Sequence, residues 1–491
     1  MKPSLPHVLT FCLAVSTQAY SRHSGKASKT CAGLQSKFGD SIVQTAGAEY
    51  LSTVSNAWSL FNTLQRPTCV MYPRNANHVQ VAMREIYRDK VRYAVQAGSH
   101  SGMTGWNNVD GGVLFAFSHM KDVKYNSTSD IITLQPGIRW GEAIAAVESY
   151  GVAPMGGRLT DVGTGLLLGG GLSYLAPEYG FSADLFKELD VVLVDGDLVT
   201  ATATNRYSDL FRALKGGANR FGIVTRYAVE AVHTGTKEDK LWFGGLILYP
   251  EEAAEALVNA TAKFVRSVTE PKAALFTCLF YAKTGGVLTD THLVTLFYRG
   301  PSLPLDIYGD FLSIPFTSQS LGPASYSDAV NALGPGADRG FGQNFGGSAI
   351  AGPTSRYLDA LNHFKNYSSI FQDELDHTLM AFTPILQSQI NAGRTRGRNA
   401  IDPPDGPYAA VVFQDQYKQG VARISQELQD GRKLLFKQIP PSPGLPLYVG
   451  ESDATQNAFA TYSGYEFLKR TYAKYDPTRF NVQYADGPPG L

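Results

Sequence analysis

Residues 154–171 read PMGGRLTDVGTGLLLGGG and are the most informative stretch of this sequence. Seven of the eighteen positions are glycine. Each glycine in a regular helix or strand costs about 0.5–1 kcal/mol relative to alanine, so the stretch suits neither element. Val162 and the run from Leu166 to Leu168 are interspersed among the glycines. This spacing indicates a packed backbone that lies close to a ligand, and a long flexible loop is the alternative.

Two further glycine-rich stretches lie on either side of it. Upstream, residues 95–102 read VQAGSHSG, a strand that runs into a tight turn of small residues. Consecutive backbone N–H groups in such a turn form a concavity that binds a pyrophosphate. Downstream, residues 209–225 read DLFRALKGGANRFGIVT, which predicts a short helix, a glycine turn and a strand. None of these is the G-x-G-x-x-G fingerprint or a P-loop, so a Rossmann dinucleotide-binding fold is disfavoured.

In this order the three stretches resemble the FAD-binding module of the berberine bridge enzyme-like FAD-linked oxidases, within the vanillyl-alcohol oxidase/p-cresol methylhydroxylase (PCMH) superfamily. In that family they read G-G-H, V-G-x-G-G-x-x-x-G-G-G and D-L-F-x-A-L-x-G-G-G-x-x-F-G-I-V. Here Ser99 replaces the second glycine of the first motif and Ala218 the last glycine of the third, while the second motif is one residue shorter. The resemblance covers about residues 71–232 and resumes near the C-terminus.

The resemblance implies FAD as the cofactor, bonded through His100 to the 8α-methyl group of the flavin. Many family members add a second bond through a cysteine just before V-G-x-G. Leu159 occupies that position here, so we expect a single covalent bond. Val162 would border the oxygen pocket, where a small side chain favours an oxidase. The expected FAD-binding residues are Ala97, Gly98, Ser99, His100, Ser101, Gly102, Val162, Gly163, Thr164, Gly165, Gly169, Gly170, Ile223 and Val224.

Oxidation of a substrate by a flavin usually needs a base near the ring, and four candidates remain open. Tyr448 and Glu451 lie in residues 447–453, LYVGESD, which resemble the family's Y-x-N-E-x-D with glycine in place of its flavin-contacting asparagine. Tyr281 and Tyr298 each end an apolar strand. For each tyrosine a structural role is the alternative, because a buried hydroxyl needs only a hydrogen-bond partner. No metal-ligand spacing or Ser-His-Asp arrangement is visible, so no metal site is expected.

The predicted elements and the resemblance together divide an α+β chain into four parts. Residues 1–19 are expected to be a signal peptide, and residues 20–235 a PCMH-type FAD-binding domain of two subdomains. Residues 236–446 alternate strands with longer amphipathic helices, which predicts a substrate domain with an antiparallel sheet covered by helices. Residues 447–491 are expected to return to the FAD domain.

The N-terminus predicts secretion. Lys2 precedes the apolar residues 8–16, a run too short to span a bilayer, and residues 17–19 suit cleavage, whereas a buried strand is the alternative. Sequons at Asn126, Asn259 and Asn366 predict a glycoprotein with these turns on the surface.

Removal of the leader also removes Cys12 and leaves three cysteines. We predict that Cys31 and Cys69 form a disulfide, because both precede the first glycine motif and the bond would hold the N-terminal arm. Cys278 lies in an apolar run and is expected to be a buried small hydrophobe.

Charge restricts the partners. Lys plus Arg and Asp plus Glu both number 43, with no long run of one sign, so no field attracts nucleic acid or an anionic membrane. We therefore expect a monomer whose partners are a small-molecule substrate and O2.

The leading functional hypothesis is a secreted FAD-dependent oxidase that takes a hydride from a small organic molecule to flavin N5 and reduces O2 to H2O2. Saccharide oxidases of the family usually carry the double flavin link, so its absence favours a hydrophobic secondary metabolite. One alternative is an oxidative or redox-neutral cyclase of a biosynthetic pathway. Another is a secreted binding protein that has lost flavin turnover.

Overall fold

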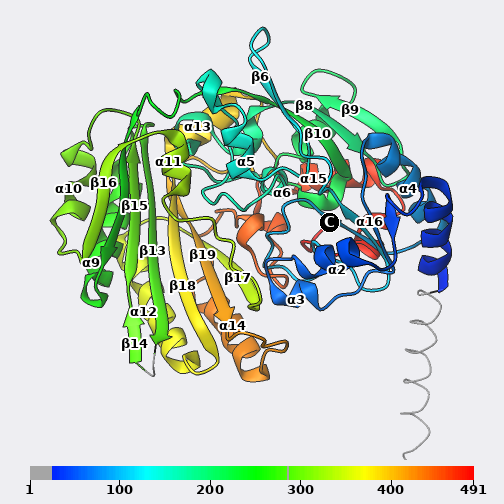
Figure 1. Ribbon diagram of the computed structural model, residues 1–491. Coiled ribbons are helices and arrows are strands. Elements are labelled where there is room, and N and C mark those ends of the chain that lie inside the picture. Colours follow the sequence, from blue (N-terminus) through cyan, green and yellow to red (C-terminus); the bar gives the residue numbers. More distant parts are fainter. Residues whose placement is uncertain (1–24, 285–286) are drawn as a thin grey trace, which may run out of the picture.

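Four sheets organise the protein, whose computed structural model describes residues 25–284 and 287–491 (Figure 1). The first has the order β1 (Val43–Gln44), β2 (Cys69–Met71), β4 (Val113–Ala116), β3 (Tyr93–Gln96), and its last three strands run parallel. Helices α2 (Ala48–Ser55), α3 (Leu60–Thr63) and α4 (Ala76–Asp89) connect these strands. In α4 the side chains at positions 79, 82, 83 and 86 are buried, as the period of an α-helix with one apolar face requires.

The second sheet is antiparallel, with the order β5 (Val123–Asn126), β6 (Ile131–Leu134), β10 (Ile223–Glu230), β8 (Phe186–Val192), β9 (Leu198–Thr202). Between β6 and β8 the chain forms α5 (Trp140–Ala145), β7 (Val152–Ala153), α6 (Gly165–Leu168) and α7 (Ala176–Tyr179). β7 pairs with β11 (Val232–His233) in a small sheet of their own. The glycine-rich stretch therefore connects elements of this subdomain and is irregular over most of its length.

The third large sheet is antiparallel and forms the left half of the molecule in Figure 1. Its order is β16 (Ser318–Ala324), β12 (Trp242–Tyr249), β15 (His292–Tyr298), β13 (Ala273–Thr284), β18 (Leu375–Ile385), β19 (Tyr408–Tyr417), β17 (Gln343–Ile350), with β14 (Val287–Asp290) paired to β13. Helices α9 (Ala254–Ser267), α12 (Thr354–Phe371) and α14 (Gln426–Gln438) cover one face and share a hydrophobic core with it. The predicted α+β class and helix-covered sheet are confirmed.

The C-terminal segment returns to the FAD-side subdomains. Helix α15 (Tyr465–Tyr475) packs against α8 (Ser208–Ala213), and α16 (Phe480–Tyr484) against η3 (Ala218–Phe221). The buried Arg220 guanidinium donates to Asn481 Oδ1 at 2.9 Å, which joins the third glycine motif to this segment. Residues 458–475 form two elements, because η6 (Phe459–Thr461) and α15 are separated by a turn.

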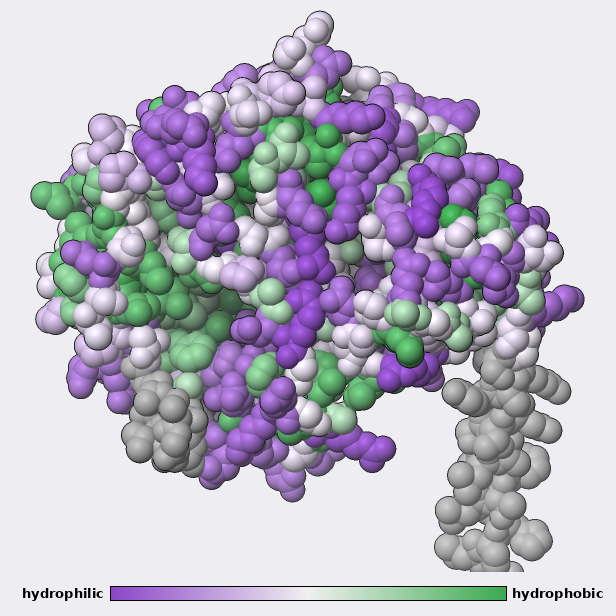
Figure 2. Space-filling model, in the orientation of Figure 1, coloured by the Kyte–Doolittle hydropathy of each residue, from purple (hydrophilic) through white to green (hydrophobic). Residues whose placement is uncertain are grey.

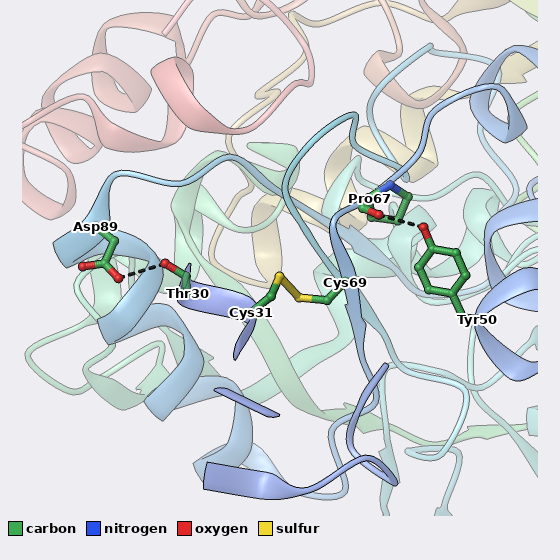
Figure 3. The surroundings of a disulfide bond; sticks show 6 residues. All are labelled: Thr30, Cys31, Tyr50, Pro67, Cys69 and Asp89. Carbon is green, nitrogen blue, oxygen red and sulfur yellow. Dashed lines mark hydrogen bonds between the residues drawn. A yellow bond between two sulfur atoms is a disulfide. The ribbon is translucent and has the colours of Figure 1, made fainter. Parts of the chain in front are cut away.

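The predicted disulfide is confirmed (Figure 3). Cys31 lies on the helix of residues 25–38 and bonds to Cys69 at the start of β2, with 5.9 Å between their Cα atoms. Cys278 is buried, as predicted. The three sequon asparagines are exposed, but only Asn126 lies at a turn. Asn259 and Asn366 lie in helices α9 and α12, which corrects the prediction of turns there. The predicted signal peptide and Cys12 lie outside the described residues, among which no helix is both long and apolar enough to cross a membrane.

Candidate active site

One cavity of about 1480 Å³, counting the part open to solvent, brings the sequence motifs together. It is lined by β3 and the turn after it, by residues 158–168, by the start of β10, by Phe345 of β17, and by the C-terminal residues Tyr448, Gly450 and Glu451.

The first two glycine motifs touch each other at the cavity wall. A Cβ atom added to Gly98 would lie 2.5 Å from the backbone nitrogen of Gly163, and one added to Gly163 would lie 2.5 Å from that of Gly98. Arg139 donates a hydrogen bond to the Gly98 carbonyl at 3.1 Å and so stabilises the position of Gly98 against Gly163. The glycines therefore allow two backbone segments to approach at the surface that faces the ligand.

The two departures from the family pattern keep the backbone that the glycines would adopt. Ser99 has φ of 69° and Ala218 has φ of 54°, both in the left-handed region. L-residues with a side chain pay roughly 1–2 kcal/mol for this conformation. The substitutions therefore cost stability but leave the path of the loops unchanged.

Most of the predicted FAD-binding residues line the cavity. These are Ala97, Gly98, Ser99, His100, Ser101, Val162, Gly163, Thr164, Gly165, Ile223 and Val224. Gly102, Gly169 and Gly170 do not line it, and this corrects the sequence prediction. Their missing Cβ atoms make room instead for Phe345, Val449 and Ile401 respectively, so these glycines serve the packing around the cavity.

Unpaired polar atoms also point to a polar ligand. Among the described residues, Ser99 Oγ, Asn107 Oδ1 and Asn219 Oδ1 are buried without a hydrogen-bond partner, and all three residues line the cavity. A buried polar group without a partner costs about 1–3 kcal/mol, which a bound molecule with polar groups can recover. The close glycine contacts and these unpaired atoms together fit FAD.

His100 has a defined tautomer. Its Nε2 lies 3.0 Å from the carbonyl oxygen of Gly336. A carbonyl can only accept, so Nε2 carries the hydrogen and Nδ1 keeps its lone pair. Trp58 stacks on the ring with 4.2 Å between centroids. Burial lowers the pKa of His100 to about 4, although the Gly336 carbonyl and Asp161 oppose the shift, so the imidazole is neutral near pH 7.

A buried ion pair lies on the cavity wall. Arg158 Nη2 is 3.5 Å from Glu451 Oε1, and its Nη1 donates to Thr383 Oγ1 at 2.6 Å. Burial raises the pKa of the Glu451 carboxyl, and the Arg158 guanidinium partly offsets this. Burial and the neighbouring Glu451 raise the pKa of Tyr448 above its usual range, so this phenol stays protonated. Two of the four candidate catalytic residues are therefore in the cavity.

The other two candidates, Tyr281 and Tyr298, do not line the cavity. Tyr281 is buried in the core between the large sheet and its helices, where the centroids of its ring and the Phe364 ring are 5.6 Å apart. Tyr298 is partly buried and packs against the same core. Because alternate side chains of a strand point to opposite faces, the residue before each tyrosine faces the other side of the sheet. This corrects the prediction that either acts as the base.

The face of the large sheet opposite its helices is apolar near the cavity. Phe276, Leu293, Phe345 and Leu379 are partly exposed there and surround the buried Cys278. Figure 2 shows a hollow with apolar surface over this face, where Figure 1 draws β15, β13 and β18. Arg158 extends from the FAD side to this wall, since its guanidinium lies 4.4 Å from the centroid of Phe276.

Several lining residues were not predicted. Arg158 lies within residues 154–171, but an arginine in a glycine-rich stretch gives no local sign of a partner nearly 300 residues away. Asn107, Asn219 and Phe345 likewise show no spacing that marks a site.

Fold and site together fit an FAD-binding protein. Residues 67–202 match the family described as FAD binding domain. In structure, the chain is similar to berberine bridge enzyme from Eschscholzia californica, with a TM-score of 0.76, 14% identity, and coverage of 94% of this chain and 99% of that one.

Two curated relatives bear on the class. An uncharacterized FAD-linked oxidoreductase of Arthroderma benhamiae is 32% identical over 334 residues, 66% of this chain and 64% of the relative, so the match spans less than two thirds of that protein. The bifunctional solanapyrone synthase of Alternaria solani is 24% identical over 95% of this chain and 90% of its own length. The chain therefore contains an FAD-binding domain, and its fold is similar to that of berberine bridge enzyme.

Proposed function

We propose that this protein is a secreted FAD-dependent oxidase that oxidises a small, largely apolar organic molecule, a secondary metabolite by class, and passes the electrons to O2 as H2O2. The observation that carries the proposal is the Arg158–Glu451 pair, an ionisable pair on the wall of the flavin cavity beside an apolar sheet face. Ionisable groups with shifted pKa values in a cleft are typical of catalytic sites.

FAD bound in the cavity would accept a hydride from the substrate. In the proposal, Glu451 takes the proton that the substrate releases. Its pKa, raised by burial, brings this carboxyl closer to the pH at which a general base works best, while Arg158 keeps it charged and oriented. Tyr448 stays protonated and donates a hydrogen bond to the substrate oxygen. The apolar sheet face excludes water and binds the carbon skeleton.

His100 would hold FAD through one covalent bond. Its neutral imidazole, with Nδ1 unprotonated, is the form that acts as a nucleophile, and Leu159 offers no second attachment. Val162 lines the cavity and is partly buried, which supports O2 as the acceptor by leaving little bulk beside the ring.

A biosynthetic cyclase is the second candidate, and a specific observation favours it. The relative that matches nearly the whole chain is named a synthase, which suggests a place in a biosynthetic pathway. A redox-neutral cyclisation would form product without peroxide, whereas the oxidase forms one peroxide for each product molecule.

The test is to purify the protein and follow flavin absorbance under nitrogen while hydrophobic alcohols, phenols and polyketide-like molecules are added. A substrate bleaches the flavin, and peroxide is then counted in air. Glu451→Gln should slow bleaching by about 10²–10⁴-fold, as expected for loss of a general base. Glu178→Gln is the matched control, because Glu178 is also an ion-paired carboxyl whose pKa burial raises, and it lies outside the cavity. Equal rates in Glu451→Gln and parent would refute the assigned base.

Secretion is part of the proposal. The leader-like N-terminus, the Cys31–Cys69 disulfide and three exposed sequons support it. After expression through a eukaryotic secretory pathway, the protein should be recovered from the culture medium with its N-terminus after residue 19. Its mass should fall on treatment with an N-glycosidase. A sedimentation measurement on the same material tests the expected monomer.

A further inference from the structure

A segment of the substrate domain crosses over His100. Residues 333–341, here called the strap, follow α11 (Tyr326–Asn331) and lead into β17. The strap ends in a hydrogen bond from the Leu60 amide to the Phe341 carbonyl, at 2.8 Å. At its centre the Gly336 carbonyl accepts from His100 Nε2.

Arg339 ties the strap to the residues around it through its guanidinium. Arg339 donates to Asp161 Oδ2 at 2.8 Å, to the Asn56 carbonyl at 3.0 Å and to the Ala337 carbonyl at 2.6 Å. Asp161 is 8% exposed, and its backbone amide donates to the Pro335 carbonyl at 3.1 Å. Asp161 also pairs with Arg139, which bonds to the Gly98 carbonyl two residues before His100. Both sides of the Gly336–His100 contact are therefore fixed to one buried carboxylate.

Position 336 has no room for a side chain. Gly336 has φ of 66°, and a Cβ there would lie 2.8 Å from Leu159 Cδ1 and 3.5 Å from His100 Nε2. The strap therefore places the Gly336 carbonyl against the imidazole with no side chain beside it. Gly336 lies next to both His100 and Leu159, the residue at the position of the family's second flavin bond.

We propose that the strap is a positioning element for covalent attachment of the flavin, with Gly336 selecting the His100 tautomer and Arg339 holding Gly336 in place. The inference rests on the proposed single covalent bond. With the hydrogen fixed on Nε2, only Nδ1 has the lone pair that can form a bond to carbon. As that bond forms the ring becomes cationic, and the Gly336 carbonyl and the Asp161 carboxylate stabilise the cation.

The overall attachment balances with dioxygen as the oxidant. A carbon–nitrogen bond forms between His100 and the methyl carbon of the flavin. One C–H bond of the methyl group and one N–H bond of the imidazole are lost. Their two protons and two electrons pass to O2, which becomes H2O2.

The test compares covalent with total flavin. Purified proteins are incubated in air with excess FAD, and acid-precipitated samples are scored for flavin that stays with the pellet, while desalted samples report all bound flavin. Arg339→Gln should bind FAD but attach it about tenfold more slowly, the effect of one charge-assisted hydrogen bond on a barrier. Arg339→Lys keeps one contact to Asp161 and should recover part of the rate.

Arg299→Gln is the matched control. Arg299 also joins the substrate domain to the FAD side through a carboxylate, Glu178, at 3.2 Å, but neither residue lines the cavity. It should attach FAD at the parent rate. An equal loss in Arg299→Gln would show a general loosening of the domains and overturn the inference.

The remaining outcomes are also decisive. Attachment by Arg339→Gln at the parent rate would overturn the inference and leave the proposed function intact. Faster attachment would overturn it too, because it would show that the positive charge of Arg339 matters and its hydrogen bonds do not. A parent that releases all its flavin into acid would overturn the covalent bond itself. If Arg339→Gln does not accumulate, Arg339→Lys decides by the same measurement.

Discussion

Replacing Arg158 by glutamine should raise the pKa of the Glu451 carboxyl. The guanidinium lies 3.5 Å from Glu451 Oε1 and opposes the upward shift that burial causes. Removing the positive charge leaves burial unopposed, so the carboxyl binds its proton up to a higher pH. Glutamine removes the charge and keeps an amide donor at this position.

The size of the effect follows from Coulomb's law. At 3.5 Å the attraction is about 1.2 kcal/mol with the permittivity of water and about 5 kcal/mol with an effective value of 20. The Glu451 and Arg158 side chains are 23% and 10% exposed, so the pair lies between these limits. Even the lower limit changes the proton affinity of the carboxyl by about sevenfold.

Infrared difference spectroscopy measures this without a substrate. The C=O stretch of the protonated carboxyl is titrated in the parent and in Arg158→Gln, with Glu451→Gln as the blank that assigns the band. In Arg158→Gln the band should persist to higher pH. Once a substrate is known, the acid limb of flavin reduction should move to higher pH as well, because the base must be deprotonated. A band that titrates at the parent pH, or below it, would refute the assigned pair.

Three further predictions concern the scaffold. Gly163→Ala should bind less FAD, since its Cβ would lie 2.5 Å from the backbone of the facing loop, an overpacking of about 1–3 kcal/mol, and the flavin absorbance of the purified protein measures this. Replacing both Cys31 and Cys69 by alanine opens a loop with a sequence separation of 38 and should cost about 4 kcal/mol, seen as faster proteolysis of the N-terminal arm, whereas Cys278→Ala should match the parent. Arg432→Met leaves two carboxylates buried without their shared cation and should cost about 3–5 kcal/mol, seen as a lower thermal midpoint.

The sequence by itself determined the cofactor and the architecture around it. Glycine clusters are readable without a structure, because only close backbone contact or a positive φ explains so many of them in one stretch. The family resemblance that these motifs carry implied FAD and His100. The Cys31–Cys69 pairing was readable because both cysteines precede the first glycine motif, where the bond holds the N-terminal arm.

Only the tertiary structure decided which side chains face the cavity. Tyr281 was a candidate because it ends an apolar strand, but both faces of β13 are apolar, one under the helices and one toward the cavity. When both faces are apolar, the period of two gives no sign of which face a residue occupies. Glycines show the same limit, since Gly102, Gly169 and Gly170 make room for neighbouring side chains instead of the ligand.

The contacts that define the chemistry join residues far apart in the chain. Arg158 meets Glu451, and His100 meets Gly336, across nearly 300 and more than 200 positions. A sequence motif records local backbone needs, whereas these pairs form only when segments far apart in the chain pack together. The sequence therefore indicated the flavin motifs, and the packing of distant segments placed Glu451 beside Arg158 and the Gly336 carbonyl against His100 Nε2.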